Sequence, residues 1–205
     1  SLFHSKNRVI GRDDYTPTKR DAEMRLAGLV ARCTAMHDIY EKIQKYKESP
    51  YPVLIVGETG TGKELIARAL VPAKKNLIVV NCPRFVQSET LLESELFGYV
   101  KGAFTGANAD SPGLLSQAHG QVLFLDELHQ LSVASQAKLL RLIQEMRYRR
   151  VGDNSGREIP INFKLVAAAK PEIFQMIENG QFLEDLLHRV GQLQIHVPPL
   201  RERVE

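Results

Sequence analysis

Five short apolar runs recur along the chain and alternate with longer, mixed segments. They occupy residues 53–56, 77–80, 122–125, 164–168 and 193–197. Runs of this length, rich in Val, Leu, Ile and Ala, are typical of strands that are buried on both faces. Because helix-like segments separate them, the pattern predicts an α/β fold, a three-layer sandwich around a five-stranded, mostly parallel sheet.

Helices are expected where apolar residues recur at intervals of three and four. Met36, Ile39, Tyr40 and Ile43 follow this rule, and the proline-containing segment 49–52 should end their helix. Further helices are expected over residues 65–70, 88–96, 132–146, 171–180 and 183–190.

Within residues 132–146, Ser132 is suited to the N-cap, and Ala137, Leu140 and Ile143 are expected to share one face. Glycine and polar residues indicate loops over residues 98–113 and 148–160.

Residues 1–28 differ from the rest because they are polar and charge-mixed. This composition predicts a linker or the end of an upstream regulatory region. The remaining residues, 29–205, are then expected to form one α/β domain.

A glycine-rich segment follows the first apolar run directly and precedes an expected helix. Its residues are Gly57, Glu58, Thr59, Gly60, Thr61, Gly62, Lys63 and Glu64. Glycines let the backbone turn tightly and point amide groups at phosphate oxygens, the helix N-terminus is positive, and Lys63 adds a full charge. The order strand, turn, helix predicts a phosphate-binding P-loop. The alternative is a glycine-rich turn that binds nothing.

Two acids, Asp126 and Glu127, follow the third apolar run directly. The carboxyl ends of parallel strands border the ligand crevice in open α/β sheets, so both acids are expected to face the P-loop. Asp126 would hold Mg²⁺ through water, and Glu127 would polarise the water that attacks a γ-phosphate. The alternative is a solvated acidic turn.

A second glycine-containing segment lies between these two motifs. It consists of Gly102, Ala103, Phe104, Thr105, Gly106 and Ala107. Phe104 stands among small residues without an evident packing role, which indicates a mobile loop whose tip binds a partner. The alternative is a surface loop with one inward Phe.

Composition narrows the class of protein. Apolar content of 43% and charged content of 25% are ordinary for a soluble globular protein, and a net charge of +3 is too small to indicate nucleic-acid binding by itself. Two distant cysteines favour a reduced compartment, and no apolar run approaches the roughly 20 residues that cross a bilayer. We expect a cytoplasmic protein without membrane contact and, since residue 1 is not Met, a fragment of a longer chain.

Taken in order, these segments resemble the AAA+ ATPase domain of bacterial enhancer-binding proteins, the activators of sigma-54 RNA polymerase. The resemblance covers residues 29–203 approximately, and residues 102–107 match the GAFTGA loop of that family. It also includes the P-loop that ends in Lys-Glu, Asn81-Cys82, Glu95–Gly98, Asp126-Glu127, Arg150-Val151-Gly152 and the segment 198–203.

The resemblance implies ATP and Mg²⁺ as ligands, with Asp126 and Glu64 at the metal and Glu127 as the catalytic base. Asn81 resembles the switch residue that restrains Glu127, and Arg189 resembles an arginine finger that reaches the ATP of a neighbouring subunit. A ring, usually hexameric, is thereby implied. The loop of residues 102–107 would contact sigma-54 in the RNA polymerase holoenzyme. The helical lid and the DNA-binding domain of the family are expected to be absent from residues 1–205.

Three departures from the family pattern bear on hydrolysis. Ala169-Lys170 replaces a polar Thr-Asn pair that senses the γ-phosphate, and alanine cannot donate a hydrogen bond. Leu183 replaces the first arginine of a pair, and His129-Gln130 stands where the family prefers Gly and an acid.

Two functions therefore stay open. One is an ATPase that remodels the holoenzyme, and the other is a nucleotide-binding module that assembles with ATP but hydrolyses it poorly. A small-molecule kinase is a third reading, against which Glu127 and the loop of residues 102–107 both argue.

Overall fold

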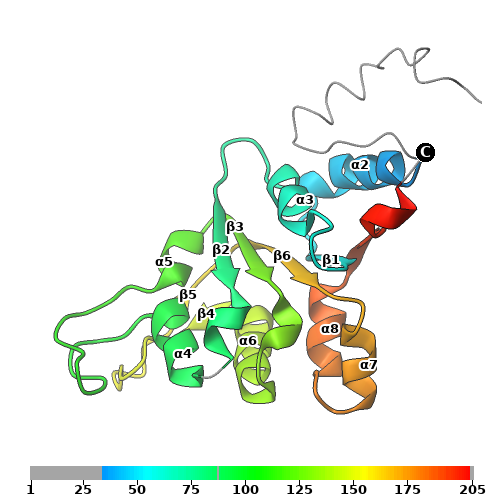
Figure 1. Cartoon of the computed structure of the whole chain (residues 1–205). Helices are drawn as coiled ribbons and strands as arrows, with labels where there is room; N and C mark the ends of the chain where they lie inside the picture. Colours follow the sequence, from blue (N-terminus) through cyan, green and yellow to red (C-terminus); the bar gives the residue numbers. More distant parts are fainter. Residues whose placement is uncertain (1–33, 87, 204–205) are drawn as a thin grey trace, which may run out of the picture.

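The computed structural model of the chain describes residues 34–86 and 88–203 (Figure 1). The linker expected over residues 1–28 lies outside them. No helix in these described residues is long and apolar enough to cross a membrane.

Five strands form one sheet in the order β2-β3-β6-β1-β7, and every neighbouring pair is parallel. Their bounds are β1 Val53–Gly57, β2 Leu77–Asn81, β3 Val122–Asp126, β6 Lys164–Ala169 and β7 Leu193–Val197. The five apolar runs of the sequence are these five strands. The expected α/β fold is confirmed, with a wholly parallel sheet.

Helices cover both faces of the sheet (Figure 1). One face carries α2 Thr34–Lys47 and α3 Lys63–Ala69. The other carries α4 Glu89–Phe97, α5 Leu114–Ala118, α6 Val133–Glu145, α7 Ile173–Glu178 and α8 Glu184–Val190. Each face has its own hydrophobic core, the first under α2 and α3 and the second under α4 to α8. Because side chains alternate along a strand, Val53 and Ile55 belong to the first core, and Leu54 and Val56 belong to the second.

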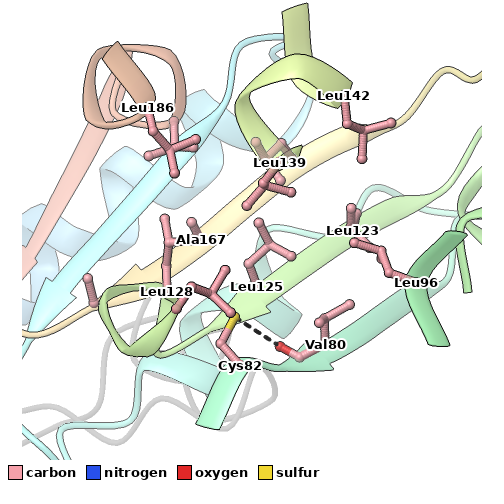
Figure 2. Packing of buried hydrophobic residues seen from close by; sticks show 14 of the residues in the cluster. Val80, Cys82, Leu96, Leu123, Leu125, Leu128, Leu139, Leu142, Ala167 and Leu186 are labelled. Atoms are coloured by element: carbon pink, nitrogen blue, oxygen red, sulfur yellow. Dashed lines mark hydrogen bonds between the residues drawn. The ribbon is translucent and has the colours of Figure 1, made fainter. Parts of the chain in front are cut away.

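The second core is the larger one (Figure 2). Leu123 and Leu125 of β3 pack there with Leu139 and Leu142 of α6, and Leu186 of α8 extends the same cluster. Each of these leucines is almost fully buried, which stabilises the fold by about 1.5–3 kcal/mol per side chain relative to exposure. The core therefore fixes the strands whose ends carry the functional residues.

The face predicted for α6 is correct only in part, since Leu140 and Ile143 pack half-buried against the core while Ala137 does not. Ser132 caps the helix as predicted, since its Oγ accepts a hydrogen bond from the Ser135 amide at 3.2 Å. The buried positions, however, are Ser135, Gln136, Leu139 and Leu142, and Ala137 is exposed.

The buried face is shifted toward Gln136, a buried polar side chain. Gln136 donates to the Leu131 and Gln181 carbonyl oxygens and accepts from the Leu183 amide. A buried amide with all these partners is stable, but hydrophobic periodicity does not reveal it.

Short elements were also missed. Residues 148–160, expected to be a loop, begin and end in two paired antiparallel strands, β4 Arg147–Tyr148 and β5 Ile159–Pro160. The helix expected from Pro171 begins at Ile173, and α5 was not expected. Three single turns were missed as well, η1 Cys82–Phe85, η2 Leu128–Gln130 and η3 Leu200–Glu202. Elements of two to five residues are too short to show a periodic pattern.

Candidate functional site

The glycine-rich segment connects β1 to α3, in the order strand, turn, helix that the sequence predicted. Gly62 has φ 87°, a left-handed conformation that favours glycine, and it forms the N-cap of α3. No described residue accepts a hydrogen bond from the amides of Gly60 or Gly62. The turn therefore presents free N–H groups at its crest, as a phosphate-binding loop requires.

Lys63 is the first residue of α3, and its side chain turns back into the loop. It is 7% exposed, and Nζ donates to the carbonyl oxygens of Gly57 and Glu58, both at 2.8 Å. Burial lowers the pKa of Lys63, while the nearby carboxylates of Asp126 and Glu127 raise it. The cation is thus held inside the loop and faces two acids.

The acid pair lies where the sequence predicted it, at the carboxyl end of β3. The Asp126 Oδ1 accepts a hydrogen bond from the Glu127 amide at 3.0 Å. Glu127 has φ 51° and ψ 47°, a left-handed conformation that costs a non-glycine residue about 1–2 kcal/mol. The fully buried Leu128 that follows anchors this turn, so that Glu127 is held at the edge of the cleft.

A cleft of about 380 Å³ joins the two motifs. Its lining is Thr59, Gly60, Gly62, Lys63, Glu64, Leu65, Arg68, Asp126 and Glu127. Burial raises the pKa of Asp126, and the nearby Glu127 and Glu64 carboxylates raise this pKa further. The hydrogen bond from the Glu127 amide and the charge of Lys63 act in the opposite direction. Asp126 therefore shares the cleft with the Glu127 and Glu64 carboxylates and with the Lys63 cation.

Magnesium fits this donor set. A hard cation beside Asp126 would relieve the repulsion among the three carboxylates, and Mg²⁺ is usually held by one or two carboxylates together with phosphate oxygens. Among the described residues, no group of three or more His, Cys, Asp or Glu could hold a metal ion by itself. The Glu64 carboxylate forms an ion pair with Arg68 at 2.7 Å.

A second pocket, of about 420 Å³, has Gly57 and Glu58 of the P-loop in its lining and was missed from the sequence. It is lined by Ala35, Asp38, Ile39, Lys42, Val56, Gly57, Glu58, Pro171, Phe174, His196, Val197, Pro198 and Pro199. Phe174 and His196 stack with their ring centroids 6.4 Å apart. A largely apolar pocket with aromatic walls beside a P-loop suits a nucleotide base. Its residues come from distant segments, so no local motif marks them.

The structure places Asn81 and Arg189 differently with respect to this cleft. Asn81 ends β2 and stands level with Asp126 on the neighbouring strand. In the described part of the chain, no hydrogen bond joins its side chain to Glu127. Arg189 is exposed in the last turn of α8, and among the described residues no hydrogen bond or ion pair joins its side chain to the P-loop.

The three departures from the family pattern lie in or beside the core. Ala169 is fully buried at the end of β6, and Leu183 is half-buried at the N-cap of α8. His129 is 6% exposed, and its Nδ1 has no partner among the described residues. Burial lowers the pKa of His129. The charge of Lys170 lowers this pKa further, whereas the charge of Glu127 raises it.

The loop of residues 102–107 is compact and lies far from the P-loop in Figure 1, beyond α4 and the β4–β5 pair. The Gly102 amide donates to the Ala107 carbonyl at 2.9 Å, and the Ala107 amide donates to the Phe104 carbonyl at 3.0 Å. Phe104 does have a packing partner, since its ring meets Tyr99 edge-on with centroids 4.9 Å apart. It nevertheless remains 39% exposed.

The base of this loop is closed by backbone contacts. Tyr99 forms bridges to Ser111 and Val151, and a Cβ on Gly98 would lie 2.3 Å from the Ser111 oxygen. Arg150 forms an ion pair with Asp110 at 3.3 Å, and Asp110 also accepts from the Lys101 amide. A tied base with a partly exposed apolar tip is an arrangement suited to contact with a partner.

Comparisons with known proteins agree with this architecture. The chain is 44% identical over 185 residues to the Nif-specific regulatory protein of Herbaspirillum seropedicae, covering 88% of this chain and 33% of that protein. It is 42% identical over 181 residues to the anaerobic nitric oxide reductase transcription regulator NorR of Vibrio vulnificus (strain YJ016), covering 86% and 35%. The chain thus spans about a third of the length of these curated relatives.

Solved structures give the same result. NtrX from Brucella abortus in complex with ADP matches with a TM-score of 0.75 and 28% identity, over 89% of this chain and 41% of that chain. Its complex with ATP matches with a TM-score of 0.73 and 27% identity, over 89% and 43%. The fold is therefore the AAA+ P-loop α/β fold. The profile of the family described as Sigma-54 interaction domain matches residues 29–196. The chain belongs to the family of sigma-54 interaction domains found in sigma-54-dependent regulators.

Proposed function

We propose that this chain is the ATP-binding and ATP-hydrolysing core of a sigma-54-dependent transcriptional regulator. The observation that carries the proposal is the buried Lys63, which faces Asp126 and Glu127 across one cleft at the carboxyl ends of the strands. The ATP and ADP complexes of NtrX support a nucleotide as the ligand.

In this proposal the P-loop amides bind the phosphates of ATP. The Lys63 ammonium group then leaves the Gly57 and Glu58 carbonyl oxygens and contacts the phosphates instead. The base enters the apolar pocket beside Phe174 and His196. Asp126 and Glu64 would hold Mg²⁺, which would supply positive charge against the phosphate groups. The domain acts over residues 29–205, with residues 1–28 as a linker or the end of an upstream region.

Glu127 takes a proton from the attacking water, and its fixed left-handed backbone holds the carboxylate at the cleft. Asn81, on the adjacent strand, restrains Glu127 until ATP is in place. Arg189 of a second copy stabilises the charge that develops on the γ-phosphate, which is consistent with its exposure and requires a ring, usually a hexamer.

Hydrolysis then moves the loop of residues 102–107, whose Phe104 and Thr105 contact sigma-54 in the RNA polymerase holoenzyme. We propose that this takes place in the cytoplasm without membrane contact. DNA would be bound by another domain of the full-length regulator. The transcription regulators among the curated relatives support this role.

The central test measures steady-state phosphate release against protein concentration. Glu127→Gln should bind ATP normally and lose about 10²–10⁴-fold in turnover, because the general base is gone. Arg189→Ala should abolish the rise in turnover per subunit that ring assembly produces. Glu178→Gln and His188→Ala are matched exposed controls on neighbouring helices. Turnover that is unchanged in Glu127→Gln would remove this residue from the mechanism.

The partner assignment is tested by capture of sigma-54 in the presence of a transition-state analogue of ATP. Thr105→Ala should reduce capture about tenfold or more, because the loop tip loses a contact at the interface centre. Asn154→Ala, an exposed loop residue outside the tip, is the control. Capture that survives Thr105→Ala would show that another surface binds sigma-54.

A second candidate function is a nucleotide-binding switch with weak or no hydrolysis. It is favoured by the buried Ala169, which offers no hydrogen bond to a γ-phosphate, and by Leu183, which packs where an arginine would project. Tight ATP binding with background turnover at every protein concentration would select this function.

A further inference from the structure

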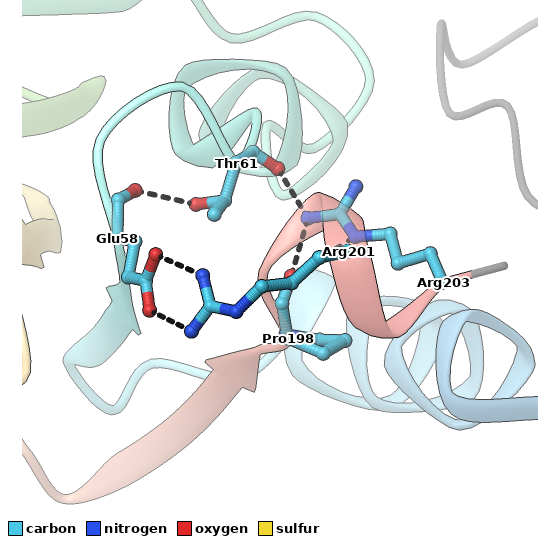
Figure 3. A network of polar contacts seen from close by, with 5 residues as sticks. All are labelled: Glu58, Thr61, Pro198, Arg201 and Arg203. Carbon is cyan, nitrogen blue, oxygen red and sulfur yellow. Dashed lines mark hydrogen bonds and ion pairs between the residues drawn. The ribbon is translucent and has the colours of Figure 1, made fainter.

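The turn η3, Leu200–Glu202, brings two arginines against the P-loop (Figure 3). Arg201 contacts Glu58 in a bidentate pair, with Nη1 to Oε2 and Nη2 to Oε1 both at 2.8 Å. This fork-to-fork geometry fixes direction as well as distance, which a lysine could not do. A segment more than 140 residues away in the sequence therefore holds the second residue of the P-loop.

Arg203 ties the crest of the same loop to the end of β7. Its Nη2 donates to the Thr61 carbonyl at 2.7 Å, and Nε and Nη2 donate to the Pro198 carbonyl at 2.9 and 2.8 Å. Thr61 is buried, and its hydroxyl donates to the Glu58 carbonyl at 2.8 Å. The two arginines and Thr61 thus form one connected network around the loop (Figure 3).

Nucleotide binding creates a demand that this network meets. Lys63 holds the Gly57 and Glu58 carbonyl oxygens, and a phosphate must draw its charge away from them. A loop tied by Lys63 alone would then lose its internal contacts when the ligand arrives. The contacts of Arg201 and Arg203 do not involve Lys63, so they can hold the loop in shape throughout.

The contacts of Arg201 and Arg203 differ in strength. Arg201 and Glu58 are 66% and 47% exposed, and an exposed ion pair contributes little to folding stability. Arg203 is half-buried and satisfies two backbone carbonyls with charge-assisted hydrogen bonds, which are stronger. We therefore expect Arg203 to dominate and Arg201 to adjust the loop.

We propose that Arg201 and Arg203 are positioning residues that keep the P-loop preformed for ATP. They act through Glu58 and Thr61 and touch no reacting atom. Because Glu58 and Pro198 line the apolar pocket, the same network also holds one side of that pocket. The inference rests on the proposed function, since it assigns the network a role in ATP binding.

The test measures the Kd of a fluorescent ATP analogue together with KM and kcat for ATP. Arg203→Met should raise Kd and KM about tenfold and leave kcat within about twofold. Without Arg203, part of the binding free energy of ATP must be used to order the loop. Arg203→Lys should recover only part of the loss, since a point charge cannot span both carbonyls. Arg141→Met, which removes another exposed guanidinium with a carboxylate partner, is the control.

The exposed pair gives a second, independent measurement if Arg203→Met does not fold. Arg201→Met and Glu58→Gln should each raise KM about two- to fivefold without lowering Tm, and the two effects should not add. The exchange of both residues, Glu58→Arg with Arg201→Glu, should restore part of the affinity.

Two outcomes separate this inference from the proposed function. If the unmodified chain binds no ATP, the proposed function fails and the positioning role fails with it. If the unmodified chain binds and hydrolyses ATP but the arginine variants keep its Kd and KM, only the positioning role is overturned. A fall in kcat and Tm at constant KM would likewise show that the network serves the fold alone.

Discussion

The two ends of the sheet each hold a buried lysine. Lys63 lies at the carboxyl end, where it is 7% exposed and donates to the Gly57 and Glu58 carbonyl oxygens. Lys164 begins β6 at the amino end, where it is 6% exposed and donates to the Tyr46 and Lys47 carbonyl oxygens at 2.5 and 2.6 Å. Burial lowers the pKa of both side chains.

Their surroundings nevertheless differ. The partners of Lys63 belong to a glycine-rich turn beside the cleft that Asp126 and Glu127 line, whereas those of Lys164 are carbonyl groups at the end of helix α2. A lysine that satisfies the last carbonyls of a helix serves as a cap. Burial and a lowered pKa therefore do not by themselves mark a functional lysine. The glycine-rich turn that Lys63 contacts, the facing acids and the position at the carboxyl ends of the strands do so.

Replacement of Lys63 should give the largest effect. Lys63→Met should weaken binding of a fluorescent ATP analogue about 10- to 100-fold, because a charge-assisted phosphate contact is lost. Its free energy of unfolding should also fall, by about 1–2 kcal/mol, because the Gly57 and Glu58 carbonyl oxygens lose their donor. Lys164→Met is the matched control for binding, and equal losses in both variants would abolish the distinction between the two ends.

Replacement of Lys164 should lower stability without affecting nucleotide binding. Lys164→Met should lower the free energy of unfolding by about 1–2 kcal/mol, because two buried carbonyl oxygens lose their donor. Nucleotide affinity should remain unchanged. Urea unfolding measures this loss, with Lys75→Met as an exposed control nearby. An unchanged unfolding midpoint would mean that water replaces the ammonium group.

The pH dependence gives the smallest and most specific effect. Burial lowers the pKa of Lys164 to about 8 from its ordinary value of 10.5, with Glu48 opposing this and Lys75 and Lys47 adding to it. Between these pH values the unfolded chain binds more protons than the folded one, so this residue makes the free energy of unfolding rise with pH. Unfolding of the unmodified chain and of Lys164→Met at pH 7.5 and 9.5 should diverge in that direction, and parallel curves would contradict it.

Much of this protein follows from local sequence. The five apolar runs specify the strands, of which β1, β3 and β6 are buried on both faces and the edge strands β2 and β7 only in part. The P-loop and Asp126-Glu127 are placed with them, since each motif begins at the last residue of a strand. The Ser132 cap of α6 is equally local. The predicted roles of Asn81, Arg189 and residues 102–107 remain predictions, because they concern a second copy of the chain, the sigma-54 partner or a nucleotide-bound state.

Tertiary structure decided what depends on contacts between distant segments. Gln136 is buried in α6 because its hydrogen-bond partners lie in other parts of the chain, and the apolar pocket is assembled from α2, the P-loop, α7 and the end of β7. The sheet order places β1 beside β7, which brings Arg201 and Arg203 onto the P-loop. Sequence patterns report which groups avoid water. Hydrogen bonds between distant residues depend on geometry that only the packed sheet and helices provide.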